Sequence, residues 1–146
     1  MIQPKWIEEA KEEYRGFTYL VLACCNQGYR CGYVQIPEGH PYYEKREFTK
    51  FNVGYDINWG LSFSGRLKDQ TGWWIGFDCH HINNGVDVEL IRNNYPAEEV
   101  EQILDELEEF YYEDFYKYAP SKTDVERDCM GIIDELLDGR RLILED

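Results

Sequence analysis

From Phe17 to Ile36 the sequence reads FTYLVLACCNQGYRCGYVQI. Two runs rich in apolar, aromatic and β-branched residues, Phe17–Cys25 and Tyr29–Ile36, enclose a polar Asn-Gln-Gly turn. A short turn that contains glycine, placed between two such runs, is typical of a β-hairpin. We therefore expect an antiparallel sheet that contains this hairpin.

Two shorter runs extend the predicted sheet. Gly60 to Gly65 alternates small polar and bulky apolar residues, and Trp73 to Cys79 is dominated by bulky apolar residues. The residues at 68–72, between these runs, predict a turn. Together with the hairpin, these runs predict a sheet of about four strands.

Outside the strands the apolar residues follow a helical period. Trp6, Ile7, Ala10 and Tyr14 share one helical face, which predicts a short N-terminal helix over residues 4–14. The last third of the chain predicts two longer helices, one that follows Pro96 and one with Thr123 and Glu126 as its capping box. Their apolar faces consist of Val100, Ile103, Leu104, Leu107, Phe110 and Tyr111 in the first helix, and of Val125, Cys129, Ile132, Ile133 and Leu136 in the second.

The second of these helices is expected to end at Gly139, and residues 142–144 are expected to form a final short strand. A chain of 146 residues and 17.4 kDa fits a single domain over residues 1–146. The predicted fold class is α+β, with an antiparallel sheet of about four strands packed against two C-terminal helices and a short N-terminal helix.

The negative charge is concentrated in the C-terminal part of the chain. The formal net charge is −14, yet residues 14–97 contain eight acidic and eight basic residues and are neutral overall. Residues 98–114 contain nine acidic residues and no basic residue. This uneven distribution indicates two functional regions within one domain.

Composition excludes several classes of protein. With 43% hydrophobic and 16% aromatic residues, the chain is too apolar for a disordered acidic protein, and its charge argues against direct binding of nucleic acid. No apolar run approaches the roughly 20 residues of a membrane span, and the N-terminus lacks the apolar segment of a secretory signal. We expect a soluble cytoplasmic protein without membrane contacts, whose five cysteines form no disulfide framework and whose Cys24 and Cys25 are buried thiols.

The acidic helix and its aromatic end are the first candidate site. Carboxylates spaced closely along a helix approach the charge density of a nucleic-acid strand, and tyrosines often anchor protein interfaces. We expect this surface to bind a basic protein or nucleoprotein complex, although an acidic face that only keeps the protein in solution is the alternative. The predicted partner-binding residues are Glu98, Glu101, Asp105, Glu108, Glu109, Tyr111, Tyr112 and Tyr116.

A second candidate site would bind a nucleotide or another small ligand. It combines the Pro-Glu-Gly-His-Pro loop, which would hold His40 and Tyr42, with Trp59 and the Asp-Cys-His-His corner that contains Asp78 and His81. Aromatic rings stack on bases, and histidine or arginine side chains can bind phosphates. Arg30, Arg66 and Arg92 are the arginines available for this role.

A third possibility is a Cys/His hydrolase or metal protein built from Cys31, His40, Cys79 and His81. Cysteine and histidine are both metal ligands and nucleophile–base partners. The spacing of these residues matches no standard zinc pattern, so we assign no catalytic residue, metal or cofactor. In each of these loops, the alternative is a structural role in which the side chains bond to nearby backbone groups.

The residues quoted so far carry a resemblance over about positions 30–81. Cys-Gly-Tyr-Val from Cys31, Gly-His-Pro from Gly39, Gly-Leu from Gly60 and Trp-Trp-Ile-Gly-Phe-Asp-Cys-His-His from Trp73 resemble a family of uncharacterised phage and prophage proteins. The family often has His-Gly-Gly-Leu where this chain has Asn-Trp-Gly-Leu from Asn58.

The resemblance implies a viral or mobile-element origin and no particular activity. By analogy with small acidic phage proteins, it favours an inhibitor of host defence, such as an anti-CRISPR protein that blocks a nuclease complex. We therefore rank a non-enzymatic interaction protein first, a ligand-binding module second and a Cys/His enzyme third.

Overall fold

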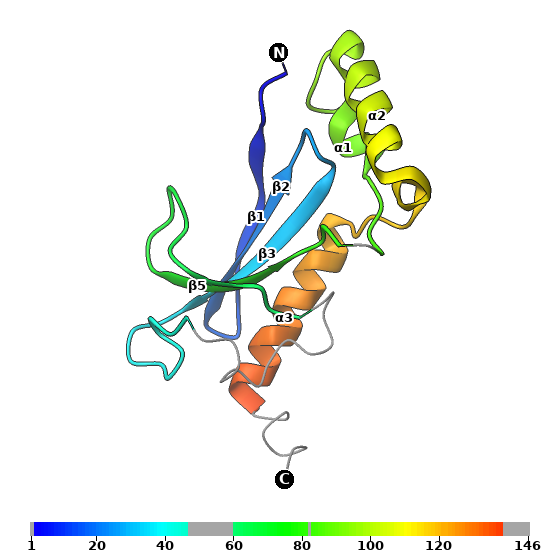
Figure 1. Cartoon of the computed structure of the whole chain (residues 1–146). Coiled ribbons are helices and arrows are strands. Elements are labelled where there is room, and N and C mark those ends of the chain that lie inside the picture. Colours follow the sequence, from blue (N-terminus) through cyan, green and yellow to red (C-terminus); the bar gives the residue numbers. More distant parts are fainter. Residues whose placement is uncertain (1, 47–59, 82, 139–146) are drawn as a thin grey trace.

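The computed structural model describes residues 2–46, 60–81 and 83–138 (Figure 1). Five strands form one antiparallel sheet in the order β1-β2-β3-β5-β4. Their bounds are β1 Trp6–Tyr14, β2 Phe17–Cys24, β3 Tyr29–Ile36, β4 Phe63–Gly65 and β5 Trp73–Asp78. The α+β class and the antiparallel sheet are confirmed, and the sheet has five strands where we expected about four.

The predicted hairpin is formed by β2 and β3, whose register pairs Cys24 with Tyr29 across the turn. On the other side of β3, strand β5 pairs Ile36 with Trp73 and Cys31 with Asp78. The short edge strand β4 pairs Phe63 with Gly76. These three strand pairs confirm the hairpin and the two shorter runs, with β4 beginning at Phe63, three residues later than we expected.

The prediction of an N-terminal helix over residues 4–14 is wrong, because these residues contain strand β1. The register between β1 and β2 shifts between Glu8 and Ala10, where β1 has an extra residue. This β-bulge places Ile7 and Ala10 opposite Ala23 and Val21, on one face of the sheet although they are three residues apart. Apolar residues three positions apart also lie on one face of a helix, so the residues around the bulge show a helix-like pattern in the sequence.

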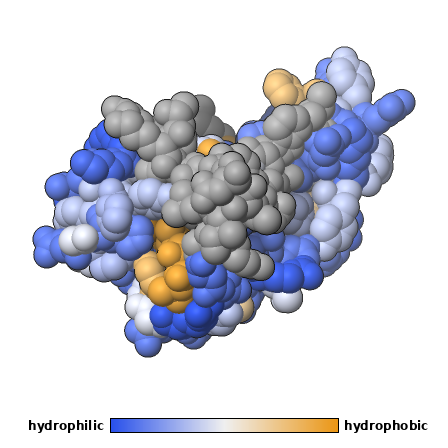
Figure 2. All heavy atoms as spheres, turned by 90° about the horizontal axis from the view of Figure 1, so that it is seen from below, coloured by the Kyte–Doolittle hydropathy of each residue, from blue (hydrophilic) through white to orange (hydrophobic). Residues whose placement is uncertain are grey.

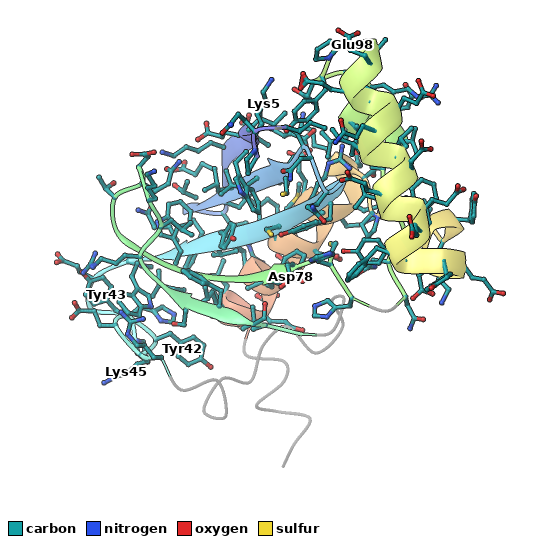
Figure 3. The ribbon with its side chains drawn as sticks, turned by 45° about the horizontal axis from the view of Figure 1, so that its top comes forward. Lys5, Tyr42, Tyr43, Lys45, Asp78 and Glu98 are labelled. Atoms are coloured by element: carbon teal, nitrogen blue, oxygen red, sulfur yellow. The ribbon has the colours of Figure 1, made fainter. Side chains whose placement is uncertain are left out.

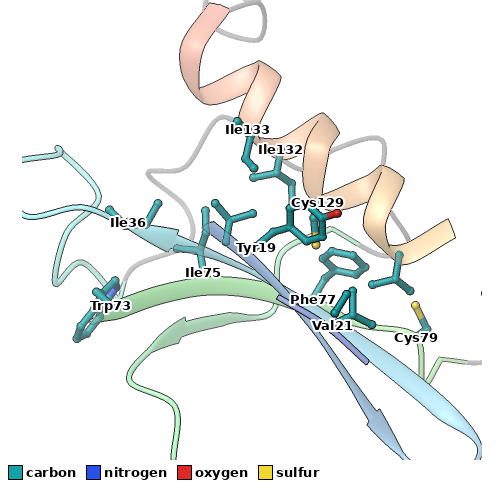
Figure 4. Close-up of a cluster of buried hydrophobic side chains, with 13 residues drawn as sticks. Tyr19, Val21, Ile36, Trp73, Ile75, Phe77, Cys79, Cys129, Ile132 and Ile133 are labelled. Carbon is teal, nitrogen blue, oxygen red and sulfur yellow. The ribbon is translucent and has the colours of Figure 1, made fainter. Parts of the chain in front are cut away.

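Helix α3, Lys122–Asp138, packs against one face of the sheet (Figure 4). Its buried residues Val125, Cys129, Ile132 and Ile133 meet side chains of all the longer strands. The strand residues in this core are Ala10, Tyr19, Val21, Val34, Ile36, Trp73, Ile75 and Phe77, and Cys79 joins them directly after β5. The apolar face that we predicted for this helix is therefore the face that covers the sheet.

The N-terminal cap of α3 lies two residues earlier than predicted. The Ser121 hydroxyl accepts from the backbone N–H of Asp124 at 3.1 Å, and the Asp124 carboxylate accepts from the backbone N–H of Ser121 at 2.9 Å. This reciprocal pair is a capping box in which aspartate takes the place of glutamate. Thr123 and Glu126 therefore do not form the capping box that we expected.

The other helices form a second, smaller cluster. Helix α1 Val88–Arg92, helix α2 Ala97–Tyr111 and the 3-10 helix η2 Tyr112–Tyr116 pack together through Ile91, Val100, Ile103, Leu107 and Phe115. Of the two long helices, α3 alone packs extensively on the described strands, so the expectation that both pack against the sheet is wrong, although Leu90 of α1 also packs against Ala23 of β2. Helix α1 was not predicted because its five residues are too short to show a helical period.

The buried side chain of Arg30 joins the sheet to both helical regions. Its guanidinium lies 2.5 Å from the Glu9 carboxylate in the β1 bulge and 2.6 Å from the carboxylate of Asp87, which caps α1. It also donates to the carbonyl of Pro120, just before α3. Arg30 is therefore engaged in structural contacts and is not available for the ligand-binding role that we considered.

Among the helices that the structure describes, none is long and apolar enough to span a membrane. All five cysteines are free and buried, which confirms the burial that we expected for Cys24 and Cys25. Two expectations, the end of α3 at Gly139 and a strand over residues 142–144, fall outside the described residues. Seen from below, the described surface is mainly hydrophilic, with hydrophobic areas of small extent (Figure 2).

Candidate functional site

Helix α2 presents two faces of different chemistry. Val100, Ile103 and Leu107 are buried in the second cluster, which fixes the rotation of the helix about its axis. The five carboxylates that we predicted to bind a partner are all exposed: Glu98, Glu101, Asp105, Glu108 and Glu109. They extend along α2 from Glu98, which lies at the end of the helix away from the sheet (Figure 3).

These carboxylates are not neutralised within the described part of the chain. The ion pairs found there involve Arg15, Arg30, Arg66, His81, Lys117 and Arg127, and none of them includes an acidic residue of α2. The one hydrogen bond between side chains on the helix joins the Gln102 amide to Glu106 at 3.3 Å. Within the described residues, the acidic face of α2 therefore remains without a neutralising cation.

An exposed aromatic surface follows the acidic face. Tyr112 has a φ of 53° and ends α2, after which Phe115 turns inward as the buried anchor of η2. The neighbouring rings remain in solvent, with exposed fractions of 72% for Phe110, 74% for Tyr112 and 71% for Tyr116. Tyr112 and Tyr116 are exposed as we predicted, whereas Phe110, which we placed on the apolar face of the helix, is also exposed.

Tyr111 differs from its neighbours because it turns toward the sheet. Its hydroxyl is hydrogen bonded to Nε2 of His80, and the His80 ring stacks on Tyr29 with the ring centroids 4.2 Å apart. Tyr29 in turn contacts Trp6 edge-on at 5.8 Å. Tyr111 therefore joins the aromatic end of α2 to the sheet and is not a freely exposed anchor.

The Asp78 corner is held together by its own contacts. Oδ1 of Asp78 lies 2.9 Å from Nε2 of His81 and accepts from the backbone N–H of His80 at 3.1 Å. Its other oxygen accepts from the Ser62 hydroxyl at 3.4 Å. Burial lowers the pKa of His80, which favours the neutral ring in its stack. These contacts give Asp78 and His81 a structural role at the end of β5.

The structure does not bring the two parts of the predicted ligand site together. The loop with His40 and Tyr42 follows Ile36, which pairs with the first residue of β5, whereas Asp78 is the last residue of that strand. The first and last of six strand residues lie about 17 Å apart, so the two groups lie at opposite ends of the sheet, as Figure 3 shows for Tyr42 and Asp78. Trp59 lies outside the described residues.

The His40 loop is also stabilised internally. Nδ1 of His40 accepts from the backbone N–H of Tyr42 at 3.0 Å, and the His40 ring lies edge-on to Phe17. Burial lowers the pKa of His40. Its ring is therefore part of the packing at this end of the sheet.

The Cys/His constellation does not assemble in the described residues. Cys31 lies opposite Asp78 on one face of the sheet, and Cys79 points into the core on the other face. Burial raises the pKa of both thiols to about 12, which disfavours a thiolate nucleophile. No group of three His, Cys, Asp or Glu side chains suited to a metal is present among the residues described.

Judged by the residues that the structure describes, only the acidic and aromatic surface of α2 and η2 forms a continuous arrangement among the predicted sites. We define this surface, called the acidic–aromatic surface below, by Glu98, Glu101, Asp105, Glu108, Glu109, Phe110, Tyr112 and Tyr116. Comparison with protein-family models, with curated proteins and with solved structures finds no match to this chain.

Proposed function

We propose that the protein is a non-catalytic interaction protein that binds a basic surface of a nucleic-acid-handling protein through the acidic–aromatic surface. One observation carries the proposal. The exposed face of α2 bears carboxylates without ionic partners in the described residues, and exposed rings follow it directly. A partner that has both basic and apolar groups would complement this combination.

The charge density of α2 supports a partner that normally binds nucleic acid. The 15 residues of the helix span about 22 Å at a rise of 1.5 Å per residue. Seven of these residues are acidic. This spacing of about 3 Å per charge is close to the 3.4 Å spacing of charges along one DNA strand. The charge density of the helix is therefore similar to that of the nucleic acid that such a partner normally binds in its basic groove.

The exposed rings supply the second part of the proposed interface. A charged surface alone speeds association and directs it, whereas large aromatic side chains contribute most to affinity once they are desolvated. Phe110, Tyr112 and Tyr116 lie within seven residues of one another at the end of the acidic face. We expect these rings to form the desolvated centre of the contact and the carboxylates to form its charged rim.

The resemblance of residues 30–81 to phage and prophage proteins favours a host protein as the partner. A viral protein that occupies the nucleic-acid groove of a host nuclease complex would inhibit that complex. The proposed outcome of binding is therefore inhibition of host defence. A nucleotide-binding role at the His40 and Asp78 loops is less favoured because these loops lie at opposite ends of β5.

Displacement of DNA tests this proposal directly. Purified basic nucleic-acid-binding proteins of the host, including its nuclease complexes, are loaded with fluorescent duplex DNA, and the release of DNA is followed by anisotropy. We expect the wild-type protein to displace DNA from its target. Because the contact depends on charge, the triple substitution Glu101→Lys, Asp105→Lys and Glu108→Lys should weaken displacement by at least roughly 100-fold.

The matched control reverses three exposed carboxylates elsewhere, with Glu12→Lys, Glu13→Lys and Glu38→Lys. This variant has the same net charge as the first one, so a difference between them reports the position of the charges. The control should displace DNA within a few-fold of wild type. Equal loss in both variants, or full displacement by the α2 variant, would contradict the proposed surface.

A further inference from the structure

The face of the sheet opposite α3 contains a cavity that the proposed function does not use. The register of the strands places Trp6, Leu22 and Tyr33 on this face. They line a cavity of about 640 Å³ together with Glu8 and the loop residues Leu67, Lys68, Asp69 and Gln70. A cavity of this volume lies in the range of about 300–1,000 Å³ that is usual for small-molecule sites.

The loop over residues 66–72 forms one wall of the cavity, and β1 forms the opposite wall. Gln70 joins the two walls, because its amide nitrogen donates to Glu8 at 3.0 Å and its amide oxygen accepts from Lys11 at 3.0 Å. The sheet is strongly twisted, and this loop, in green, rises beside it in Figure 1. The strands and the loop therefore border the cavity, which is open to solvent elsewhere.

The loop is fixed by hydrogen bonds that do not involve a ligand. The carbonyl of Thr71 accepts from the Trp74 indole N–H at 3.0 Å and from the Gln35 amide at 2.9 Å. The Arg66 guanidinium donates to the carbonyl of Gly72 at 3.2 Å. The cavity is therefore preformed, and binding would require little ordering of this loop.

The chemistry of the lining selects the kind of ligand. Trp6 is 50% exposed and offers an indole ring at the edge of the cavity, with Leu22 and Tyr33 as its apolar floor. One oxygen of Glu8 accepts from Gln70, and within the described residues the other oxygen has no hydrogen-bond donor. An aromatic ring beside a carboxylate with spare acceptor capacity suits a planar ring that carries an N–H donor.

The charge of the cavity lining further restricts the class of ligand. The lining has two carboxylates, Glu8 and Asp69, and one ammonium group, Lys68, so its charged groups sum to −1. A phosphate group would be repelled by this field, whereas a neutral or cationic ring would not. We propose that the cavity binds a planar nitrogen heterocycle with an exocyclic amine, of the nucleobase type, which stacks on Trp6 and donates to Glu8.

This binding site is separate from the acidic–aromatic surface, so either proposal can fail without the other. The test uses the full chain, labelled with ¹⁵N, and a titration with adenine, purine, adenosine and AMP. Adenine and purine differ only in the exocyclic amine, and adenosine and AMP differ only in the phosphate. We expect saturable shifts at Trp6, Leu22, Tyr33 and Gln70, with adenine binding roughly tenfold more tightly than purine because of the bond to Glu8.

Two variants test the proposed contacts of the ligand with Glu8 and Trp6. Glu8→Gln removes the charge but keeps an oxygen that accepts from Gln70, so it should reduce the advantage of adenine over purine to about twofold or less. Trp6→Ala should weaken both ligands. Tyr116→Ala removes an exposed ring outside the cavity and should change neither affinity. Thermal unfolding of each variant shows whether the fold is retained.

Three results would overturn the proposal. The first is the absence of saturable shifts around the cavity at up to about 10 mM adenine. The second is equal binding of adenine and purine by the wild-type protein, since the amine would then have no role. The third is tighter binding of AMP than of adenosine, because the cavity would then favour the phosphate that its charge should repel.

Discussion

At the scale of single residues, Arg30 is the side chain whose loss should be most costly. Its side chain is 8% exposed, and the Glu9 and Asp87 carboxylates beside it are also largely buried. Replacing Arg30 with Met would leave two carboxylates without their cation. We expect Arg30→Met to lower the free energy of unfolding by about 3–5 kcal/mol, measured by urea denaturation.

The matched control is Arg66→Met. Arg66 pairs with Glu44 at 3.1 Å and donates to the carbonyl of Gly72, but the Arg66 and Glu44 side chains are more than half exposed. Exposed contacts of this kind contribute about 0–1 kcal/mol each, so this variant should lose much less stability than Arg30→Met. Equal destabilisation by the two substitutions would show that Arg30 does not join the sheet to the helices in the way described.

At the scale of elements, the N-terminus of α3 gives a pH-dependent prediction. Hydrogen bonds, first from the Tyr118 hydroxyl and then from the Ser121 backbone N–H, lower the pKa of Asp124. A carboxyl whose pKa is lower in the folded state stabilises the fold above its unfolded pKa of about 4, and this stabilisation is lost as the pH falls through the folded pKa.

We therefore expect Asp124→Asn to be less stable than wild type at pH 7, by about 0.5–2 kcal/mol, since the charged acceptor of the cap is lost. The difference between the two proteins should shrink as the pH falls below about 4. Thermal unfolding of both proteins at pH values from 7 to 2.5 measures this difference in stability. A difference that stays constant over this range would exclude the charge of Asp124 as its source.

Elements defined by local patterns were the ones that the sequence predicted well. The hairpin of β2 and β3 was predictable because its turn and both strands are adjacent in the chain. Strand β1 was not predictable, because its bulge at Glu9 becomes apparent only from the pairing of β1 with β2. The position of α2 was also not predictable, since its apolar face fits equally well against a sheet or against other helices.

The same distinction applies to the candidate sites. The acidic–aromatic surface was largely predictable, because residues 98–116 are contiguous in the chain and one helical period orients most of them. The cavity beside Trp6 was not, because its lining comes from β1, β2, β3 and the loop over residues 66–72. The one sign of the cavity in the sequence was a tryptophan, Trp6, among charged residues. The helical interpretation of residues 4–14 obscured this sign.

At the scale of the whole molecule, a small third apolar cluster joins the sheet to the helical cluster, with Leu90 of α1 packed against Ala23 and Cys25. The sheet and α3 form one cluster, and α1, α2 and η2 form the other. The ion pairs of Arg30, the hydrogen bond between Tyr111 and His80, and the backbone bond from Asp87 to Gly28 add to this junction. A further backbone bond joins Gly85 to the segment after η2. The acidic–aromatic surface therefore depends on contacts that are separate from the main core.

Gly85 allows this dependence to be tested. Its backbone N–H donates to the carbonyl of Tyr118 at 3.0 Å, and a Cβ at this position would lie 1.7 Å from the carbonyl oxygen of Lys117. Gly85→Ala must therefore displace the segment that follows η2. We expect faster amide hydrogen exchange over residues 97–116, weaker binding by the acidic–aromatic surface, and unchanged protection in β2, β3 and α3.

Gly131→Ala is the control, because a Cβ placed at that position in α3 would meet no described atom within 4 Å apart from its chain neighbours and the backbone of the helix itself. Alanine in an open helical site should stabilise the protein by about 0.5–1 kcal/mol and leave exchange in α2 unchanged. If Gly85→Ala instead weakened protection uniformly through the sheet and α3, the two clusters would unfold as one unit. The binding surface could then not be altered separately from the core, and the division of the molecule into two clusters would describe its packing but not its stability.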